Sequence, residues 1–124
     1  MLSDTLRCTE GEGDKIMKRI KDADDIKAFY EATNSLHDGE FAFCDLCGDT
    51  LRVGVDVTSI AGCPRVDMVF RGVKAWQIRK SNYIFSSNIA FEDGGIIWAD
   101  ASRFDDEILK GSDYVRAESL EWTI

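Results

Sequence analysis

The feature that most constrains the fold is an alternation of apolar with polar or small residues over positions 51–57. One residue in two is apolar there: Leu51, Val53, Val55 and Val57. A period of two places every second side chain on the same face of an extended strand, which predicts a half-buried β-strand. Residues 40–46 are expected to pair with this strand through a tight turn at 47–49. Further strands are predicted at about 66–70, 73–79, 83–91, 96–100 and 114–122.

A different spacing precedes the strands. Its apolar residues recur at intervals of three and four, as in one stripe along a helix: Ile16, Ile20, Ala23, Ile26 and Tyr30. Asp14 is a candidate N-cap for this helix, and Asp24 is a candidate cap for a second one. The sequence therefore leaves open one long helix or two short ones, and residues 1–12 are expected to form a loose N-terminal segment.

The last strand contains a break in its alternation. Val115 and Ala117 share one parity, whereas Leu120 and Trp122 share the other. A β-bulge near Ser119 would bring both sets to the buried side. Taken together, the patterns predict a single α+β domain over residues 1–124. Its N-terminal helix would pack on a curved, mostly antiparallel sheet of about six to seven strands.

Composition limits the partners and the compartment. The net charge of the 124 residues is -8 and the pI is near 4.6. Nucleic acids and anionic membranes select for Lys and Arg, so neither is expected as a partner. The first residues lack the apolar core of a signal peptide, and no apolar run has the length of a membrane span. These observations predict a cytoplasmic protein. Acidic residues are concentrated at 92–121, whereas basic residues prevail at 65–80.

Two cysteines have the spacing of a zinc knuckle. Cys44 and Cys47 are separated by two residues and followed by Gly48, and such a pair can hold one tetrahedral zinc ion. The remaining ligands would come from Cys63, Cys8 or His37, because a second pair of the same spacing is absent from the sequence. The alternative is that Cys44 lies in a strand as a small apolar residue and Cys47 begins a turn.

Catalytic chemistry finds little support in the sequence. His37 is the single histidine, and Asp38 or Glu40 could orient it as a general base. No activated nucleophile accompanies it, and an Asp38-Gly39 turn explains the segment equally well. Phosphate-binding and nucleophile-elbow motifs are also absent from the sequence. We therefore predict a binding protein and not an enzyme.

Several segments give the chain a resemblance to a known class. The segments are 36–41, 51–53, 69–73, 96–100 and 116–122, with a His-Asp-Gly turn at the start and a Leu-Glu-Trp strand at the end. In this order the chain resembles small bacterial immunity proteins of polymorphic-toxin and contact-dependent growth inhibition systems. The resemblance implies a protein without catalytic residues that binds a cognate toxin and neutralises it by covering the toxin's basic active-site surface.

An acidic immunity protein would use its carboxylates to attract such a basic partner. The residues expected to bind it are Asp105, Asp106 and Glu107 in an acidic loop, Glu92 and Asp93 at a hairpin tip, and Trp76. Trp76 lies beside Lys74 and Gln77, where it is either a partly exposed anchor or an ordinary core residue. A ligand-binding module lined by Phe43, Phe70 and Trp76 is a further alternative. Apolar edge strands also suggest pairing into a homodimer.

Overall fold

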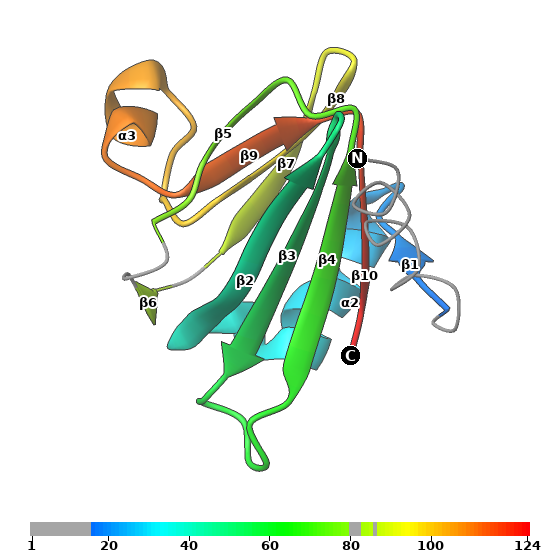
Figure 1. Cartoon of the computed structure of the whole chain (residues 1–124), viewed down its shortest axis with the longest axis vertical. Coiled ribbons are helices and arrows are strands. Elements are labelled where there is room, and N and C mark those ends of the chain that lie inside the picture. Colours follow the sequence, from blue (N-terminus) through cyan, green and yellow to red (C-terminus); the bar gives the residue numbers. More distant parts are fainter. Residues whose placement is uncertain (1–15, 80–82, 86) are drawn as a thin grey trace.

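Two antiparallel sheets make up most of the protein (Figure 1). The structure is a computed structural model that describes residues 16–79, 83–85 and 87–124. The six-stranded sheet has the order β1 (Lys18–Arg19), β10 (Ser119–Thr123), β4 (Arg65–Arg71), β3 (Thr50–Val57), β2 (Gly39–Cys47) and β6 (Tyr83–Ile84). The four-stranded sheet has the order β5 (Ala75–Gln77), β9 (Tyr114–Ala117), β8 (Gly95–Ala99) and β7 (Asn88–Glu92).

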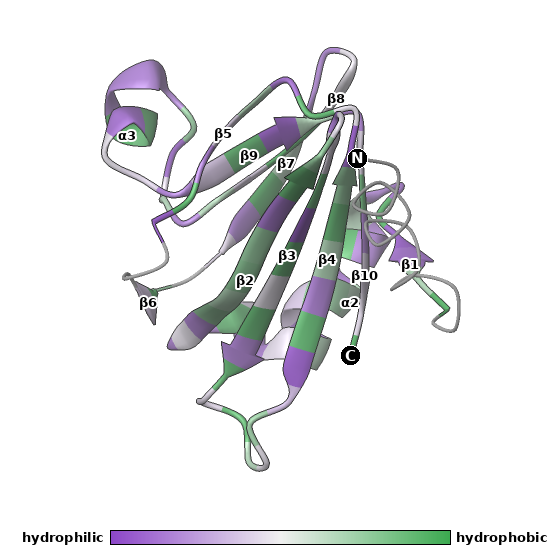
Figure 2. Cartoon of the chain, viewed as in Figure 1, coloured by the Kyte–Doolittle hydropathy of each residue, from purple (hydrophilic) through white to green (hydrophobic). Residues whose placement is uncertain are grey.

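The period of two predicts the central strands correctly. β2 pairs with β3, and β3 with β4, in antiparallel register. The alternate apolar side chains of β3 point inward, and Leu51, Val53, Val55 and Val57 are fully buried. Figure 2 shows the alternation as green and purple bands along these strands. The hairpin of β7 and β8 at 92–95 is confirmed as well.

The division into two sheets corrects the prediction of one curved sheet. Two chain segments cross from one sheet to the other at a shared corner, between β4 and β5 and between β9 and β10. At this corner the Glu118 amide donates to the carbonyl oxygens of Arg71 at 2.9 Å and Gly72 at 3.1 Å. Gly72 has a φ of 67°, a conformation that glycine adopts without strain. The break predicted near Ser119 is therefore this change of sheet.

Both sets of apolar residues in the last predicted strand are nevertheless buried, as expected. One set faces the common core from β9 and the other faces it from β10. Val115 and Leu120 are fully buried, and Trp122 is 3% exposed. The predicted strand over 83–91 is also two strands: β6 pairs with β2 in one sheet, whereas β7 pairs with β8 in the other. The strand predicted at 73–79 is confined to β5.

Helix α2 (Ala23–Thr33) contacts both sheets. The Phe29 ring meets Trp122 of β10 edge-on at 5.2 Å between centroids, and the Tyr30 hydroxyl accepts the Ile89 amide of β7 at 2.8 Å. The helix is shorter than the apolar stripe predicted. Ile16 is 89% exposed and the chain forms β1 before it becomes helical, so tertiary pairing with β10 overrides the local spacing. A 3-10 turn, η1 (Asn34–Leu36), follows.

The cap of α2 provides a first test. The Asp22 side chain accepts the Asp25 amide at 2.9 Å, whereas the predicted cap Asp24 lies in the first turn and Asp14 lies outside the described residues. We expect D22A to lower the free energy of unfolding by about 1 kcal/mol, because the Asp25 amide in the first turn of the helix loses its hydrogen-bond acceptor. D24A is the matched control and should cost less than about 0.5 kcal/mol. Urea unfolding measures both, and equal losses would contradict the assignment of the cap.

The acidic segment after β8 is a helix and not the predicted loop. α3 (Asp106–Lys110) is capped by Asp105, whose side chain accepts the Ile108 amide at 3.1 Å. Its Leu109 packs with Ile97 and Ala99 of β8 in a second, smaller core. These two residues face away from Trp98, which belongs to the main core. α3 thus covers part of the outer face of the four-stranded sheet.

Candidate functional site

Two exposed aromatic rings flank a hollow in the surface, which we call the aromatic cleft. It has a volume of about 440 Å³ and is lined by Arg79, Tyr83, Phe85, Asp100 and residues 111–113. An adjoining depression of about 460 Å³ shares Phe85 and Asp100 with it. Tyr83 is 62% exposed and Phe85 is 79% exposed. Exposure of two neighbouring aromatic rings is typical of a binding surface, because large apolar side chains are otherwise buried.

The backbone that carries these rings is held in place from two sides. β6 pairs with β2, and the Asp38 amide donates to the Ile84 carbonyl oxygen at 2.8 Å. The Phe85 amide donates to both carboxylate oxygens of Asp100 at 3.2 Å, and its carbonyl oxygen contacts Nδ1 of His37. Ile84, between the two rings, is fully buried. The alternation therefore directs Tyr83 and Phe85 outward from a fixed backbone.

The opposite wall of the aromatic cleft is fixed by hydrogen bonds between β5 and the turn after α3. Asp113 is only 3% exposed and accepts the Arg79 amide at 2.9 Å, with Nε of Arg79 at 3.5 Å. Arg79 also donates to the Gly111 carbonyl oxygen at 2.6 Å. The side-chain Nε2 of Gln77 donates to the carbonyl oxygens of Lys110 and Ser112 at 3.0 and 2.8 Å. A wall built in this way is preorganised, so little ordering would oppose binding.

Glu40 of β2 adds a carboxylate beside the aromatic cleft. It accepts a hydrogen bond from the Tyr83 hydroxyl. This hydrogen bond and the negative charge of Glu40 raise the pKa of Tyr83 above its ordinary value of 10.0. Both effects stabilise the protonated phenol. We expect E40Q to lower the Tyr83 pKa, as measured by a pH titration of the tyrosine ring signals in NMR. An unchanged Tyr83 pKa in E40Q would contradict this pairing, and Tyr114 provides an internal control.

The acidic residues expected to bind a partner form two separate groups. Asp106 and Glu107 are exposed on α3, whose C-cap Gly111 lies in the wall of the aromatic cleft. Asp105 is engaged as the helix cap and pairs with Arg103 at 3.4 Å. Glu92 and Asp93 lie at the other end of β8, and the five residues of that strand span roughly 16 Å.

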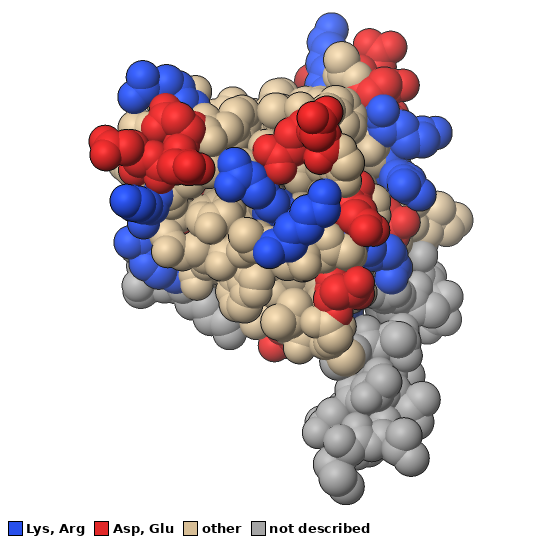
Figure 3. Space-filling model, turned by 90° about the horizontal axis from the view of Figure 1, so that it is seen from above, with Lys and Arg blue, Asp and Glu red and all other residues tan. Residues whose placement is uncertain are grey.

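These two groups therefore do not make one continuous acidic patch. Glu92 is further neutralised by Arg116, whose Nε lies 3.2 Å from its carboxylate. Figure 3 shows basic and acidic side chains interspersed on the face seen from above. Of the expected acidic residues, Asp106 and Glu107 are exposed on the helix that leads into the wall of the aromatic cleft, and the expected interface is restricted to this end of the four-stranded sheet.

The aromatic residues named from the sequence are distributed over different surfaces. Trp76 is 38% exposed on the edge strand β5, opposite Val115. Phe70 is fully buried in the core. Phe43 points to the outer face of the six-stranded sheet, where the guanidinium groups of Arg52 and Arg65 lie 5.9 and 5.7 Å from its ring centroid. The three rings thus do not line the common concave face that a ligand-binding module would need.

The candidate zinc ligands are also placed separately. Cys47 is disulfide-bonded, whereas Cys44 and Cys63 form no disulfide. A disulfide sulfur is not the thiolate that binds zinc. His37 lies beside Phe85 and, at 3.6 Å, Asp38, and Cys8 lies outside the described residues. Within residues 16–79, 83–85 and 87–124, no three potential ligands form a group that could hold a metal ion. A zinc-to-protein ratio near zero in the purified full chain would remove the zinc alternative.

Comparison with known proteins identifies no matching family model, no similar curated protein and no similar solved structure. Within the described part of the chain, no helix combines the length and the apolar character needed to cross a bilayer. The site is therefore interpreted from its own geometry.

Proposed function

We propose that this chain is a protein-binding domain that recognises a basic protein through the aromatic cleft and the carboxylates of α3. The observation that carries the proposal is the exposure of Tyr83 and Phe85 on a backbone fixed by Asp100 and β2. Rigid aromatic rings give a large contact area at a low entropic cost, and such residues commonly dominate protein interfaces. The proposed mechanism of inhibition is occlusion of the partner's active-site surface, as expected of an immunity protein that neutralises a toxin domain.

Charge provides the second part of the proposed mechanism. Asp106 and Glu107 are exposed, and Glu40 and Asp100 lie along the aromatic cleft. Arg79 is the cation of the cleft, and it is paired with Asp113. The exposed carboxylates would accelerate association with a basic surface, and this acceleration would decrease with added salt. The rings would then determine the rate of dissociation.

Charge reversal tests this division of roles. The partner is first captured from a lysate of the source cells with the full chain as bait. We expect D106K/E107K to lower the association rate by about tenfold at low salt, with a smaller decrease at high salt. D24K/E31K on α2 makes the same change in net charge and should have a weaker effect. Asp105 is left intact because it caps α3.

Stopped-flow mixing with the captured partner measures these rates. Equal effects of the two double variants would show that only net charge matters and would remove α3 from the interface. The immunity role has its own readout: co-expression of the wild-type chain should restore growth to cells that produce the captured partner. A partner that does not affect growth would contradict the immunity role but leave protein binding intact.

A further inference from the structure

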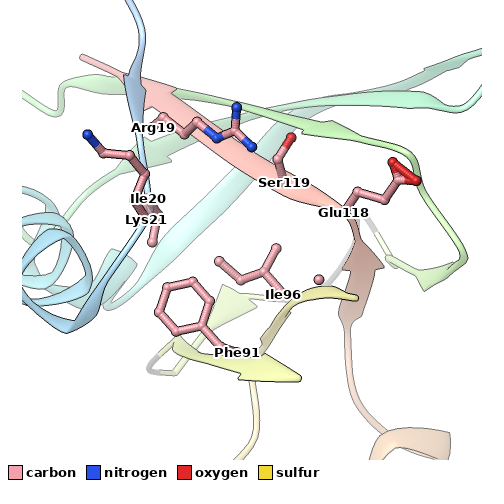
Figure 4. Close-up of a pocket in the computed structure, with 8 residues that line it drawn as sticks. Arg19, Ile20, Lys21, Phe91, Ile96, Glu118 and Ser119 are labelled. Carbon is pink, nitrogen blue, oxygen red and sulfur yellow. The ribbon is translucent and has the colours of Figure 1, made fainter. Parts of the chain in front are cut away.

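A second hollow lies between the N-terminal strand and the hairpin of β7 and β8, and we call it the basic pocket (Figure 4). Its volume is about 410 Å³, within the range of small-molecule sites. Arg19 and Lys21 contribute two cations from β1 and the residues after it. Phe91 and Ile96 contribute apolar surface from the hairpin. This combination differs from the acidic surroundings of the aromatic cleft.

The two cations lie on one side of a fixed segment. Ile20, between them, is 3% exposed and its amide donates to the Leu120 carbonyl oxygen at 3.0 Å. Because alternate residues of an extended segment point the same way, Arg19 and Lys21 both point away from the core. The ion pairs among the described residues involve other cations, so neither Arg19 nor Lys21 has a carboxylate partner there. These two cations outnumber the one carboxylate of the lining, Glu118, and so favour an anionic ligand.

The apolar side of the basic pocket is equally well defined. Phe91 is 47% exposed, whereas Ile96 is 2% exposed and forms part of the core beneath it. Figure 4 shows Phe91 and Ile96 across the hollow from Arg19 and Ser119, with Glu118 at the end remote from Lys21. A wholly polar anion would leave the apolar surface of Phe91 and Ile96 exposed to water. A ligand with an apolar body would cover it.

We propose that the basic pocket binds a small apolar carboxylate. Its carboxylate would lie against the Arg19 guanidinium, which Figure 4 shows turned toward Ser119, and its aromatic or aliphatic body would lie against Phe91 and Ile96. The Lys21 ammonium extends the other way and would attract the anion at longer range. The elements that form this site differ from those of the aromatic cleft, so the inference stands independently of the proposed protein partner.

The test is an NMR titration of the ¹⁵N-labelled full chain with 2-naphthoate and with its neutral analogue 2-naphthamide. We expect 2-naphthoate to shift the amide signals of residues 19–21 and 91–96, and to bind at least about tenfold more tightly than the amide. R19Q/K21Q should remove this preference for the carboxylate. F91A should weaken both compounds about equally, because it removes apolar contact alone.

K27Q/K110Q is the matched control, since it changes the net charge by the same amount at exposed positions away from the basic pocket. It should leave the affinity for 2-naphthoate within about twofold of wild type. Equal binding of the two compounds, shifts confined to other residues, or unaltered binding by R19Q/K21Q would each overturn the proposal. The dispersion of the amide spectrum verifies that every variant is folded.

Discussion

Replacing Trp98 with alanine is expected to lower the free energy of unfolding by about 4 kcal/mol. Trp98 is fully buried at the centre of β8, where it faces Val115 of β9. Its ring meets Phe41 of β2 edge-on, with 6.3 Å between centroids, and so joins the two sheets. Removing it opens a cavity where the sheets meet and eliminates an aromatic contact. Urea unfolding followed by circular dichroism measures the loss.

The matched variant W98F should behave differently. The indole Nε1 of Trp98 is buried and has no hydrogen-bond partner in the described part of the chain. An unsatisfied buried donor costs about 1–3 kcal/mol, and phenylalanine removes this penalty while retaining a ring. We therefore expect W98F to cost only about 1 kcal/mol, because the smaller ring leaves some space unfilled. A loss in W98F as large as in W98A would show that the indole makes a favourable hydrogen bond.

The second large effect concerns partner binding. Y83A/F85A should weaken the complex with the captured protein by at least about 30-fold, because loss of central aromatic residues often costs 2 kcal/mol or more. Both side chains are mainly exposed in the free protein, so stability should change by less than about 0.5 kcal/mol. Titration calorimetry measures the affinity, and urea unfolding measures the stability.

F91A is the control for this prediction. Phe91 is also an exposed phenylalanine, 47% exposed, but it lies beside the basic pocket. Its replacement should change the affinity for the protein partner by less than about threefold. If F91A and Y83A/F85A weakened the complex equally, the aromatic cleft would not be the centre of the interface.

The strands could be predicted from the sequence because their burial is periodic. The alternation over 51–57 depends only on one face being buried, and the structure confirms it. The corner at Glu118 could be predicted only as a break in the alternation of apolar residues. The change of sheet at this point depends on hydrogen bonds to Arg71 and Gly72, which are distant in the sequence. Likewise, Ile20 fits a helical stripe but lies in an extended segment, because the Leu120 carbonyl oxygen accepts its amide.

The candidate site was less accessible to sequence reasoning. Tyr83 and Phe85 have the alternation of strand residues, and this alternation predicts only that they share a face. Apolar residues are usually buried, so the alternation alone favours a face toward the core. The buried residue is instead Ile84, because β6 joins the six-stranded sheet and Asp100 binds the Phe85 amide. The acidic character of α3 could be predicted from composition, but its place beside the aromatic cleft depends on the tertiary fold.

Hydrogen exchange of the full chain, with and without the captured basic partner, tests the central claim most directly. We expect the partner to slow exchange in residues 83–85 and 100–113, which carry the aromatic cleft and α3. Exchange in the turn between β3 and β4, at residues 58–64, should stay the same. Protection confined to that turn or to α2, with residues 83–85 and 100–113 unaltered, would contradict the proposed interface.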